Sequence, residues 1–244
     1  MKKPSERLIP FVLSYKKFEE EGLKHIDPHL EENFNFSQAL LMLDHGSFSD
    51  VKMEMPRWVF YDCAIMPGVV SGYGIYKEHL DADIKNYFKL DMPFYPCAMS
   101  IMIPMMEEGS YFAHNLCSIN AMLPGKFKSV ARYSKALSLE LTKTKILYGA
   151  TKWNSDAMFV HLRFGELELV SSVTYLHGEK FTLTYKTLIQ NPWKFRDLNS
   201  LGSNFKIKCD DLDAQKKIQE DLKHSLHRYV ILHRDGDDLF LRKD

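Results

Sequence analysis

The stretch Lys135-Ala136-Leu137-Ser138-Leu139-Glu140-Leu141-Thr142 carries a strong alternating pattern. Leucines at every second position alternate with small or polar residues, and a period of two is typical of a half-buried β-strand. A second alternating run, Met158, Val160, Leu162 and Phe164, follows and leads into Gly165. The alternation therefore predicts strands in both segments.

Further strands are predicted on either side of this stretch. Residues 58–65 and 69–76 are rich in aromatic and β-branched side chains, and residues 98–106 and 111–120 flank a short connection at 107–110. Asp235-Gly236 between residues 229–233 and 239–241 is typical of a two-residue hairpin turn. Ile218, Leu222 and Leu226 recur at helical spacing and predict one amphipathic helix. The pattern predicts a mainly β fold, an antiparallel β-barrel or strongly bent sheet with one C-terminal helix.

The N-terminal quarter of the chain differs from the rest. Residues 1–56 are charged, irregular and weakly helical, whereas the strand pattern begins at Arg57. We expect residues 1–56 to form an N-terminal arm that packs on the body, and residues 57–244 to form one barrel domain.

Composition excludes several classes of function. The chain has 244 residues, and its 32 basic and 32 acidic residues give a formal net charge of zero. This balance argues against binding to nucleic acid through a basic face. Residues 98–106 form the longest apolar stretch, well below the roughly 18 residues that a membrane-spanning helix needs.

The cysteine spacing and the lack of common catalytic motifs exclude further kinds of site. Cys63, Cys97, Cys117 and Cys209 are too far apart in sequence for a Cys-x-x-Cys pair, so free thiols in a reducing compartment are expected. The sequence contains no Gly-x-Ser-x-Gly, phosphate-loop or His-Glu-x-x-His motif. We expect a cytoplasmic protein with no bound metal or cofactor.

Lys135 is the candidate catalytic residue. In a strand, residues two apart lie on the same face, so Lys135 would share the apolar side with Leu137 and with Tyr133. Burial of a lysine lowers its pKa, and a neutral amine can attack a carbonyl to form a Schiff base. The alternative is that Lys135 lies at the rim of the sheet and extends its amine into water.

Three segments resemble the central region of acetoacetate decarboxylases. They are Tyr95-Pro96-Cys97-Ala98, then Gly109-Ser110-Tyr111-Phe112-Ala113-His114, and then Arg132-Tyr133-Ser134-Lys135-Ala136-Leu137. The resemblance covers roughly residues 90–185. It implies a barrel in which Lys135 forms a Schiff base with a keto acid or another small carbonyl compound, while Tyr133 orients or protonates. It also places Tyr95, Cys97, Met99 and His114 as candidate substrate-binding residues, although the pattern favours a core position for Met99 and His114.

Two positions depart from the family pattern. Ala136 stands where the family has a second lysine, and Cys97 stands where it has a glutamate. We therefore expect lyase or aldol-type imine chemistry, with decarboxylation slow or absent. The alternatives are a non-catalytic barrel that binds a hydrophobic small molecule, and a protein that contacts a partner through the N-terminal arm. Assembly into a homo-oligomer is compatible with each of these alternatives.

Overall fold

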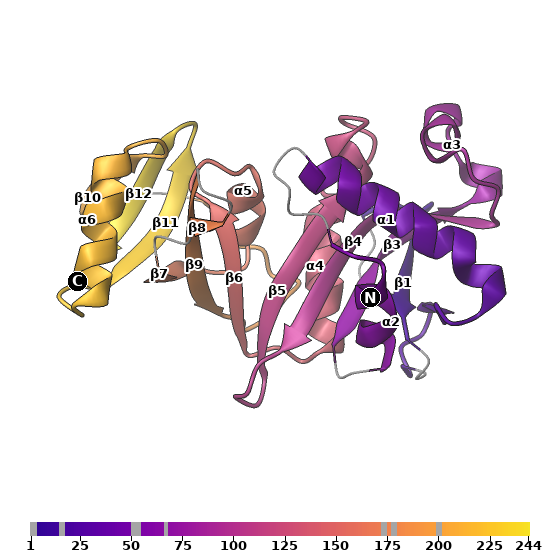
Figure 1. The fold of residues 1–244 in the computed structure, drawn as a ribbon, viewed down its shortest axis with the longest axis horizontal. Helices are drawn as coiled ribbons and strands as arrows, with labels where there is room; N and C mark the ends of the chain where they lie inside the picture. The colour runs from indigo at the N-terminus through magenta and orange to yellow at the C-terminus, as the bar shows by residue number, and fades with distance from the viewer. Residues whose placement is uncertain are drawn as a thin grey trace. The chain divides into compact units, whose positions relative to one another are not determined.

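A computed structural model describes residues 4–14, 18–49, 55–65, 68–171, 175–176, 180–198 and 202–244. The chain divides into two compact units. Unit 1 comprises Met1–Met106 and Ala113–Thr144, and unit 2 comprises Glu107–Phe112 and Lys145–Asp244. Each unit is described separately below, and both are drawn in Figure 1.

Unit 1 is a mixed sheet with helices on both faces. Its strands follow the order β5-β4-β3-β1-β2, in which β1 and β2 are parallel and the β1–β3 and β3–β4 pairs are antiparallel. Helix α1 packs against β4, and helix α4 packs against β3 and β4. Figure 1 shows α1 in front of this sheet and α4 behind it. Because both faces are covered, β3 and most of β4 are buried along their length. The elements are β1 (Ile9–Leu13), β2 (Lys24–Ile26), η1 (Glu31–Asn33), α1 (Phe34–Phe48), α2 (Trp58–Ile65), β3 (Val69–Tyr76), η3 (Lys77–His79), α3 (Ala82–Phe88), β4 (Phe94–Pro104), β5 (Ser110–Ser118), η4 (Ile119–Ala121) and α4 (Val130–Leu141).

Unit 2 is built on antiparallel strands in the order β10-β12-β11-β7-β9-β6, and β8 pairs with β9. One face of this sheet carries an apolar core that includes Leu167, Leu169, Tyr185 and Ile231, and Ile218 of α6 packs into it. The elements are β6 (Ile146–Lys152), α5 (Ala157–His161), β7 (Leu167–Ser171), β8 (Tyr175–Leu176), β9 (Lys180–Leu188), β10 (Phe205–Lys208), α6 (Leu212–Lys223), β11 (Tyr229–Asp235) and β12 (Asp238–Lys243).

The expected barrel is wrong. In each unit the strand order begins and ends at different strands, so the sheet is open and does not close on itself. Segments expected to be strands are also helical: residues 58–65 form α2, the run that begins at Lys135 falls almost entirely within α4, and α5 overlaps the start of the 158–164 run.

The composition of α4 explains why its alternating leucines predicted a strand instead of a helix. Its buried residues include Val130, Ser134 and Ser138, which are spaced four apart, and Lys135 and Leu139, also four apart. The apolar signal on this face is weak because two of its positions are serines, whereas the leucines at 137, 139 and 141 imitate a period of two. Alanine, leucine, lysine and glutamate are strong helix formers, which favours the helix over the strand.

Other predicted elements are confirmed. Residues 69–76 are β3, and the runs at 98–106 and 111–120 fall largely within β4 and β5. The hairpin at Asp235-Gly236 joins β11 and β12, and Gly236 adopts a φ of 54° there. The predicted amphipathic helix is α6, although Leu226 lies beyond its end. Residues of the expected N-terminal arm contribute β1, β2 and α1 to unit 1.

Three observations bear on the predicted surroundings of the protein. Within the described ranges, no helix has the length and apolar character needed to cross a bilayer. In the same ranges, no cluster of three or more histidine, cysteine, aspartate or glutamate residues is arranged to hold a metal ion. Cys63, Cys97, Cys117 and Cys209 are all free and buried.

Candidate functional site

Helix α4 carries both residues that the sequence singled out for catalysis. Lys135 is 1% exposed, and burial lowers its pKa to about 7. Tyr133 lies two residues before it, and its ring meets that of Tyr73 on β3 edge to face, with the ring centroids 6.5 Å apart. Lys135 is thus desolvated on a helix packed against the sheet, and not on the inner face of a barrel strand.

Buried hydrogen bonds between serine hydroxyl and carbonyl groups join α4 to the sheet. Ser138 Oγ lies 2.7 Å from Ser71 Oγ on β3, 3.3 Å from the carbonyl oxygen of Ser100 on β4 and 3.2 Å from that of Ser134. We call Ser71, Ser100, Ser134 and Ser138 the serine seam. All four residues are buried, so the helix is held at this position by polar contacts as well as by apolar packing.

The candidate substrate residues do not share one surface. Tyr95, Cys97 and Met99 on β4 have no exposed area, while His114 on β5 is exposed. Tyr95 donates a hydrogen bond of 2.7 Å to the carbonyl oxygen of Leu90.

Cys97 occupies a special position in β4. Tyr73 pairs with Ala98 and Gly74 pairs with Pro96, so Cys97 is the extra residue of a β-bulge. Burial raises the pKa of its thiol, which keeps the sulfur protonated.

Another buried polar cluster lies in unit 1, around Asp44 of α1. Its carboxylate accepts hydrogen bonds from the Met55 amide at 2.7 Å and from Asn115 Nδ2 at 2.6 Å, with Cys117 Sγ at 3.7 Å. Burial raises the pKa of Asp44, against the opposing effect of these donors. The cluster joins α1 to β5 and lies inside the core.

The loop before α4 forms a candidate anion-binding site that the sequence analysis missed. Asn120 holds the loop closed, because its Nδ2 donates to the Phe127 carbonyl at 2.7 Å and its Oδ1 accepts from the Phe127 amide at 3.0 Å. Gly125 has a φ of 80°, and Ser129, the residue before the helix, has a φ of 62°. The available signal was Pro124-Gly125 followed by two lysines immediately before a run of helix formers.

The first turn of α4 has no side-chain cap. Among the described hydrogen bonds, the Ser129 side chain makes none that caps the helix, and its hydroxyl instead accepts from Arg132 Nη2 at 3.0 Å. The start of a helix presents backbone N–H groups and a partial positive charge. Lys128 is exposed beside it. The arrangement can hold an anion such as a phosphate group.

Comparison with known proteins gives matches only among solved structures; no family model and no curated sequence matches. The chain is 11% identical to aminoglycoside 6'-acetyltransferase type Ii, with a TM-score of 0.46 over 68% of this chain and 95% of that one. It is 13% identical to the NatC complex bound to Gag peptide and CoA, with a TM-score of 0.47 over 68% and 96%. For the ribosomal-protein-S18-alanine N-acetyltransferase from Escherichia coli the identity is 10% and the TM-score 0.43, over 63% and 88%. All three are remote likenesses.

The expected relationship to acetoacetate decarboxylases is wrong. Residues 132–137, which should form the strand of the catalytic lysine, belong to helix α4, and the sheet of each unit is open. The Schiff-base lyase function is therefore wrong as well. The alternative of a barrel that binds a hydrophobic ligand fails because the sheet is open.

Proposed function

We propose that this protein is an acyltransferase that binds the phosphates of an acyl-CoA at the start of helix α4 and transfers the acyl group to an amine. The class of ligand is taken from the remote likenesses, one of which is a complex bound to CoA. The supporting observation in this chain is the first turn of α4, where Ser129 turns its hydroxyl to Arg132.

The residues at this position suit a diphosphate. A helix of 12 residues directs its partial positive charge at this loop. The exposed Lys128 adds a full positive charge, and Gly125 places little bulk in the loop. The Asn120–Phe127 pair of hydrogen bonds fixes the loop before a ligand arrives, which reduces the ordering cost of binding.

When bound, an acyl-CoA would supply an activated thioester whose acyl group can pass to a neutral amine. The contribution that we assign to the chain is to hold the phosphates at Lys128 and at backbone N–H groups of the first turn other than that of Val130, which donates to the Phe127 carbonyl at 3.4 Å. Amide groups fixed in this way need no rearrangement when the anion binds.

Calorimetric titration with CoA, and with pantetheine as a ligand that lacks the diphosphate, tests the binding. We expect CoA to bind and pantetheine to bind far more weakly. Lys128→Glu and Ala131→Glu should each weaken CoA binding by about tenfold, an effect of roughly 1.4 kcal/mol. Glutamate in a first helical turn is favourable for folding, so Ala131→Glu repels the anion without unfolding α4.

Lys143→Glu is the matched control, because Lys143 is exposed just beyond the other end of the same helix. It should leave the affinity for CoA unchanged. Release of free CoA from acetyl-CoA is then followed with spermidine, an aminoglycoside and a peptide with a free N-terminus. Equal affinity for CoA and pantetheine, or no CoA release with any amine, would overturn the proposal.

A further inference from the structure

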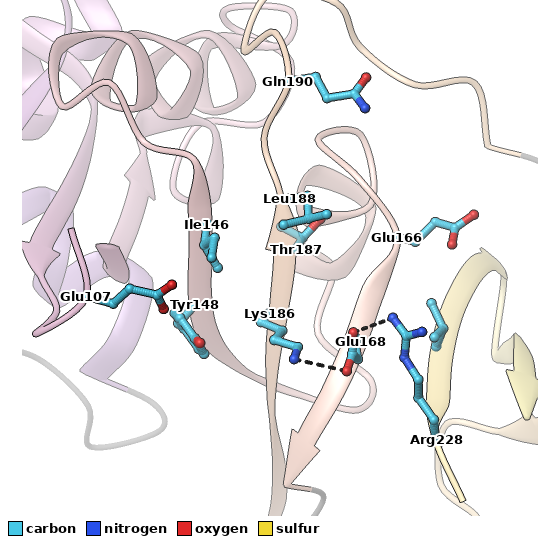
Figure 2. A pocket seen from close by; sticks show the side chains of 11 residues that line it. Glu107, Ile146, Tyr148, Glu166, Glu168, Lys186, Thr187, Leu188, Gln190 and Arg228 are labelled. Carbon is cyan, nitrogen blue, oxygen red and sulfur yellow. Dashed lines mark hydrogen bonds and ion pairs between the residues drawn. The ribbon is translucent and has the colours of Figure 1, made fainter. Parts of the chain in front are cut away.

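A cavity of about 580 Å³ lies in unit 2 (Figure 2). Ligand pockets are commonly about 300–1,000 Å³ in volume, so this cavity can admit a small molecule or a short peptide. Its lining combines apolar and charged side chains: Glu107, Ile146, Tyr148, Glu166, Glu168, Lys186, Thr187, Leu188, Gln190, Arg228 and Val230.

The strand register builds the floor of this cavity. Tyr148 on β6 pairs with Lys186 on β9, Lys186 pairs with Glu168 on β7, and Glu168 pairs with Val230 on β11. Directly paired residues lie on the same face of a sheet. The intervening residues Leu167, Leu169 and Tyr185 point to the other face, where they form the core with α6. We call the face that carries the cavity the pocket face.

Two cations on the pocket face share one carboxylate. Glu168 Oε1 lies 3.1 Å from Lys186 Nζ, and Glu168 Oε2 lies 2.5 Å from Arg228 Nη2 (Figure 2). Burial acts to raise the pKa of Glu168, but Arg228 and Lys186 outweigh it, so the pKa is lowered and the carboxylate is ionised. One carboxylate neutralises only one of the two cations, which leaves the group with one net positive charge.

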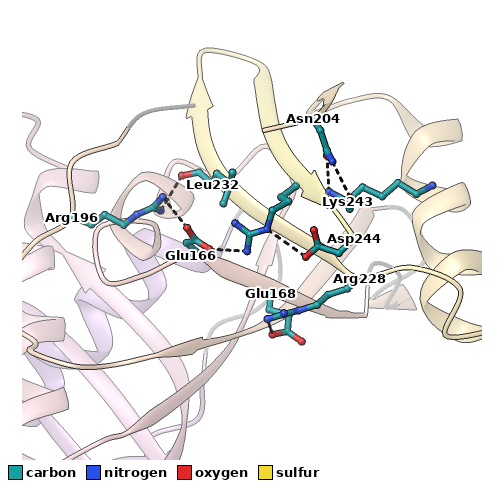
Figure 3. A network of polar contacts seen from close by, with 9 residues as sticks. Glu166, Glu168, Arg196, Asn204, Arg228, Leu232, Lys243 and Asp244 are labelled. Atoms are coloured by element: carbon teal, nitrogen blue, oxygen red, sulfur yellow. Dashed lines mark hydrogen bonds and ion pairs between the residues drawn. The ribbon is translucent and has the colours of Figure 1, made fainter. Parts of the chain in front are cut away.

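Glu166 does not supply the missing negative charge. Its two carboxylate oxygens lie 3.7 Å from Arg196 Nη2 and 3.1 Å from Arg242 Nη2, and Arg242 also meets Asp244 at 3.4 Å (Figure 3). Two carboxylates and two guanidinium groups balance within this network. The excess positive charge at Lys186 and Arg228 is therefore not cancelled by it.

Glu107 places a negative charge at the opposite end of the cavity. It precedes Gly109, whose carbonyl oxygen accepts hydrogen bonds from the amides of Lys145 at 2.8 Å and Ile146 at 3.2 Å, next to β6. Figure 2 shows Glu107 beside Tyr148, with Arg228 across the cavity. Among the residues that the structure describes, Glu107 is exposed and forms no ion pair.

The two charged ends are separated by several strands. Glu107 lies next to β6 and Arg228 directly precedes β11, and the order from β6 to β11 crosses three spacings of about 4.8 Å, so these two strands are about 14 Å apart. Ile146, Leu188 and Val230 supply the apolar surface between them. Leu188 is 70% exposed, which makes its side chain available for contact with a ligand.

We propose that the pocket face binds a short peptide of about four residues, its ammonium group at Glu107 and its carboxylate at Lys186 and Arg228. An extended chain advances about 3.4 Å per residue, so four residues span the 14 Å from β6 to β11, whereas a free amino acid spans less than one strand spacing. Apolar side chains of the peptide pack over Ile146 and Leu188. This site is contained in unit 2 and does not depend on the proposed acyl transfer.

The test is calorimetric titration of the whole protein with alanyl-leucyl-leucyl-alanine in three forms: free, N-acetylated and C-amidated. We expect the free peptide to bind most tightly and each cap to weaken binding by about fivefold, the effect of losing one partly exposed ion pair. Free alanine and free leucine should not bind.

Charge variants identify which end of the peptide lies where. Glu107→Gln should weaken binding of the free and C-amidated peptides but leave the N-acetylated peptide unaffected. Arg228→Gln should weaken the free and N-acetylated peptides but not the C-amidated one, and Lys186 still pairs with Glu168 in that variant.

Glu108→Gln is the matched control, since Glu108 is the neighbour of Glu107 and does not line the cavity. It should bind all three peptides as the wild type does. The proposal is overturned if no peptide binds at millimolar concentration, if the capped and free peptides bind alike, or if Glu108→Gln weakens binding as much as Glu107→Gln. Melting curves confirm that each variant is folded.

Discussion

The hydroxyl oxygens of Ser71 on β3 and Ser138 on α4 lie 2.7 Å apart, and neither side chain has exposed area. The two residues are 67 positions apart in the chain. A buried hydroxyl without a partner is unfavourable, so each serine stabilises the other in this environment. The contact connects the helix that carries Lys135 to the centre of the unit 1 sheet.

Replacing one of the two serines should lower the free energy of unfolding by more than the small size of the side chain suggests. Ser138→Ala removes the partner of Ser71 and should lower the free energy of unfolding by about 1–2 kcal/mol. Ser71→Ala should cost a similar amount, and the double variant clearly less than the sum, because it leaves no unpaired hydroxyl at this contact. Urea unfolding of the four proteins measures this; strictly additive losses would show that the two hydroxyls do not interact.

Lys135 should make stability depend on pH. Its pKa is about 7 in the folded protein against 10.5 normally, so between these values the unfolded chain binds more protons than the folded one. The Lys135 contribution to stability should therefore rise with pH from about 7 upwards, by at most about 1.4 kcal/mol per unit. Lys135→Met removes this dependence and should stabilise the protein most at pH 7 and below.

The measurement compares the free energy of unfolding of wild type and variant from pH 6 to 9. Lys143→Met, in which an exposed lysine of the same region is replaced, serves as control and should keep the wild-type slope. A constant difference between wild type and Lys135→Met over the whole range would contradict the lowered pKa.

The hydrogen bond from Asn115 should stabilise the ionised carboxylate of Asp44 and, through it, the folded protein. Asn115→Ala removes a charge-assisted hydrogen bond of 2.6 Å inside the core and should cost about 2 kcal/mol at pH 7. Burial already raises the pKa of Asp44, and the loss of Asn115 raises it further. The variant therefore binds more protons when folded, and its deficit should shrink as the pH falls towards 4.

Thermal or urea unfolding at pH 7 and at pH 4 tests this dependence. Asn86→Ala, at an exposed position of α3, should change stability by less than about 0.5 kcal/mol at either pH. A loss for Asn115→Ala that is equal at both values would show that the ionised carboxylate is not what Asn115 stabilises.

Gly165 lies so close to the Thr187 side chain in unit 2 that no larger residue fits there. A Cβ atom at this position would lie 2.1 Å from Thr187 Oγ1, far inside van der Waals contact. Gly165→Ala should destabilise the protein by about 1–3 kcal/mol. Adding Thr187→Ala removes the clash and should recover much of the loss, as measured by urea unfolding. Absence of any recovery would show that the contact with Thr187 Oγ1 is not the cause of the loss.

The sequence by itself determined elements whose signal is local. The aromatic and β-branched run at 69–76 predicted β3, Asp235-Gly236 predicted the turn between β11 and β12, and the spacing of Ile218 and Leu222 predicted α6. Each of these depends on residues within a few positions of one another, because turn geometry and helix periodicity are properties of short segments.

Only the tertiary structure decided that residues 130–141 form a helix and which residues come together on the pocket face. Ser138 faces the sheet, where it meets the Ser71 hydroxyl and the Ser100 carbonyl, and no local pattern marks a serine as buried. The row Tyr148, Lys186, Glu168 and Val230 likewise exists only through the pairing of β6, β9, β7 and β11. The sequence specifies the period of each strand, but the register between strands is set by packing across the whole unit. The position of each charge on the pocket face follows from that register.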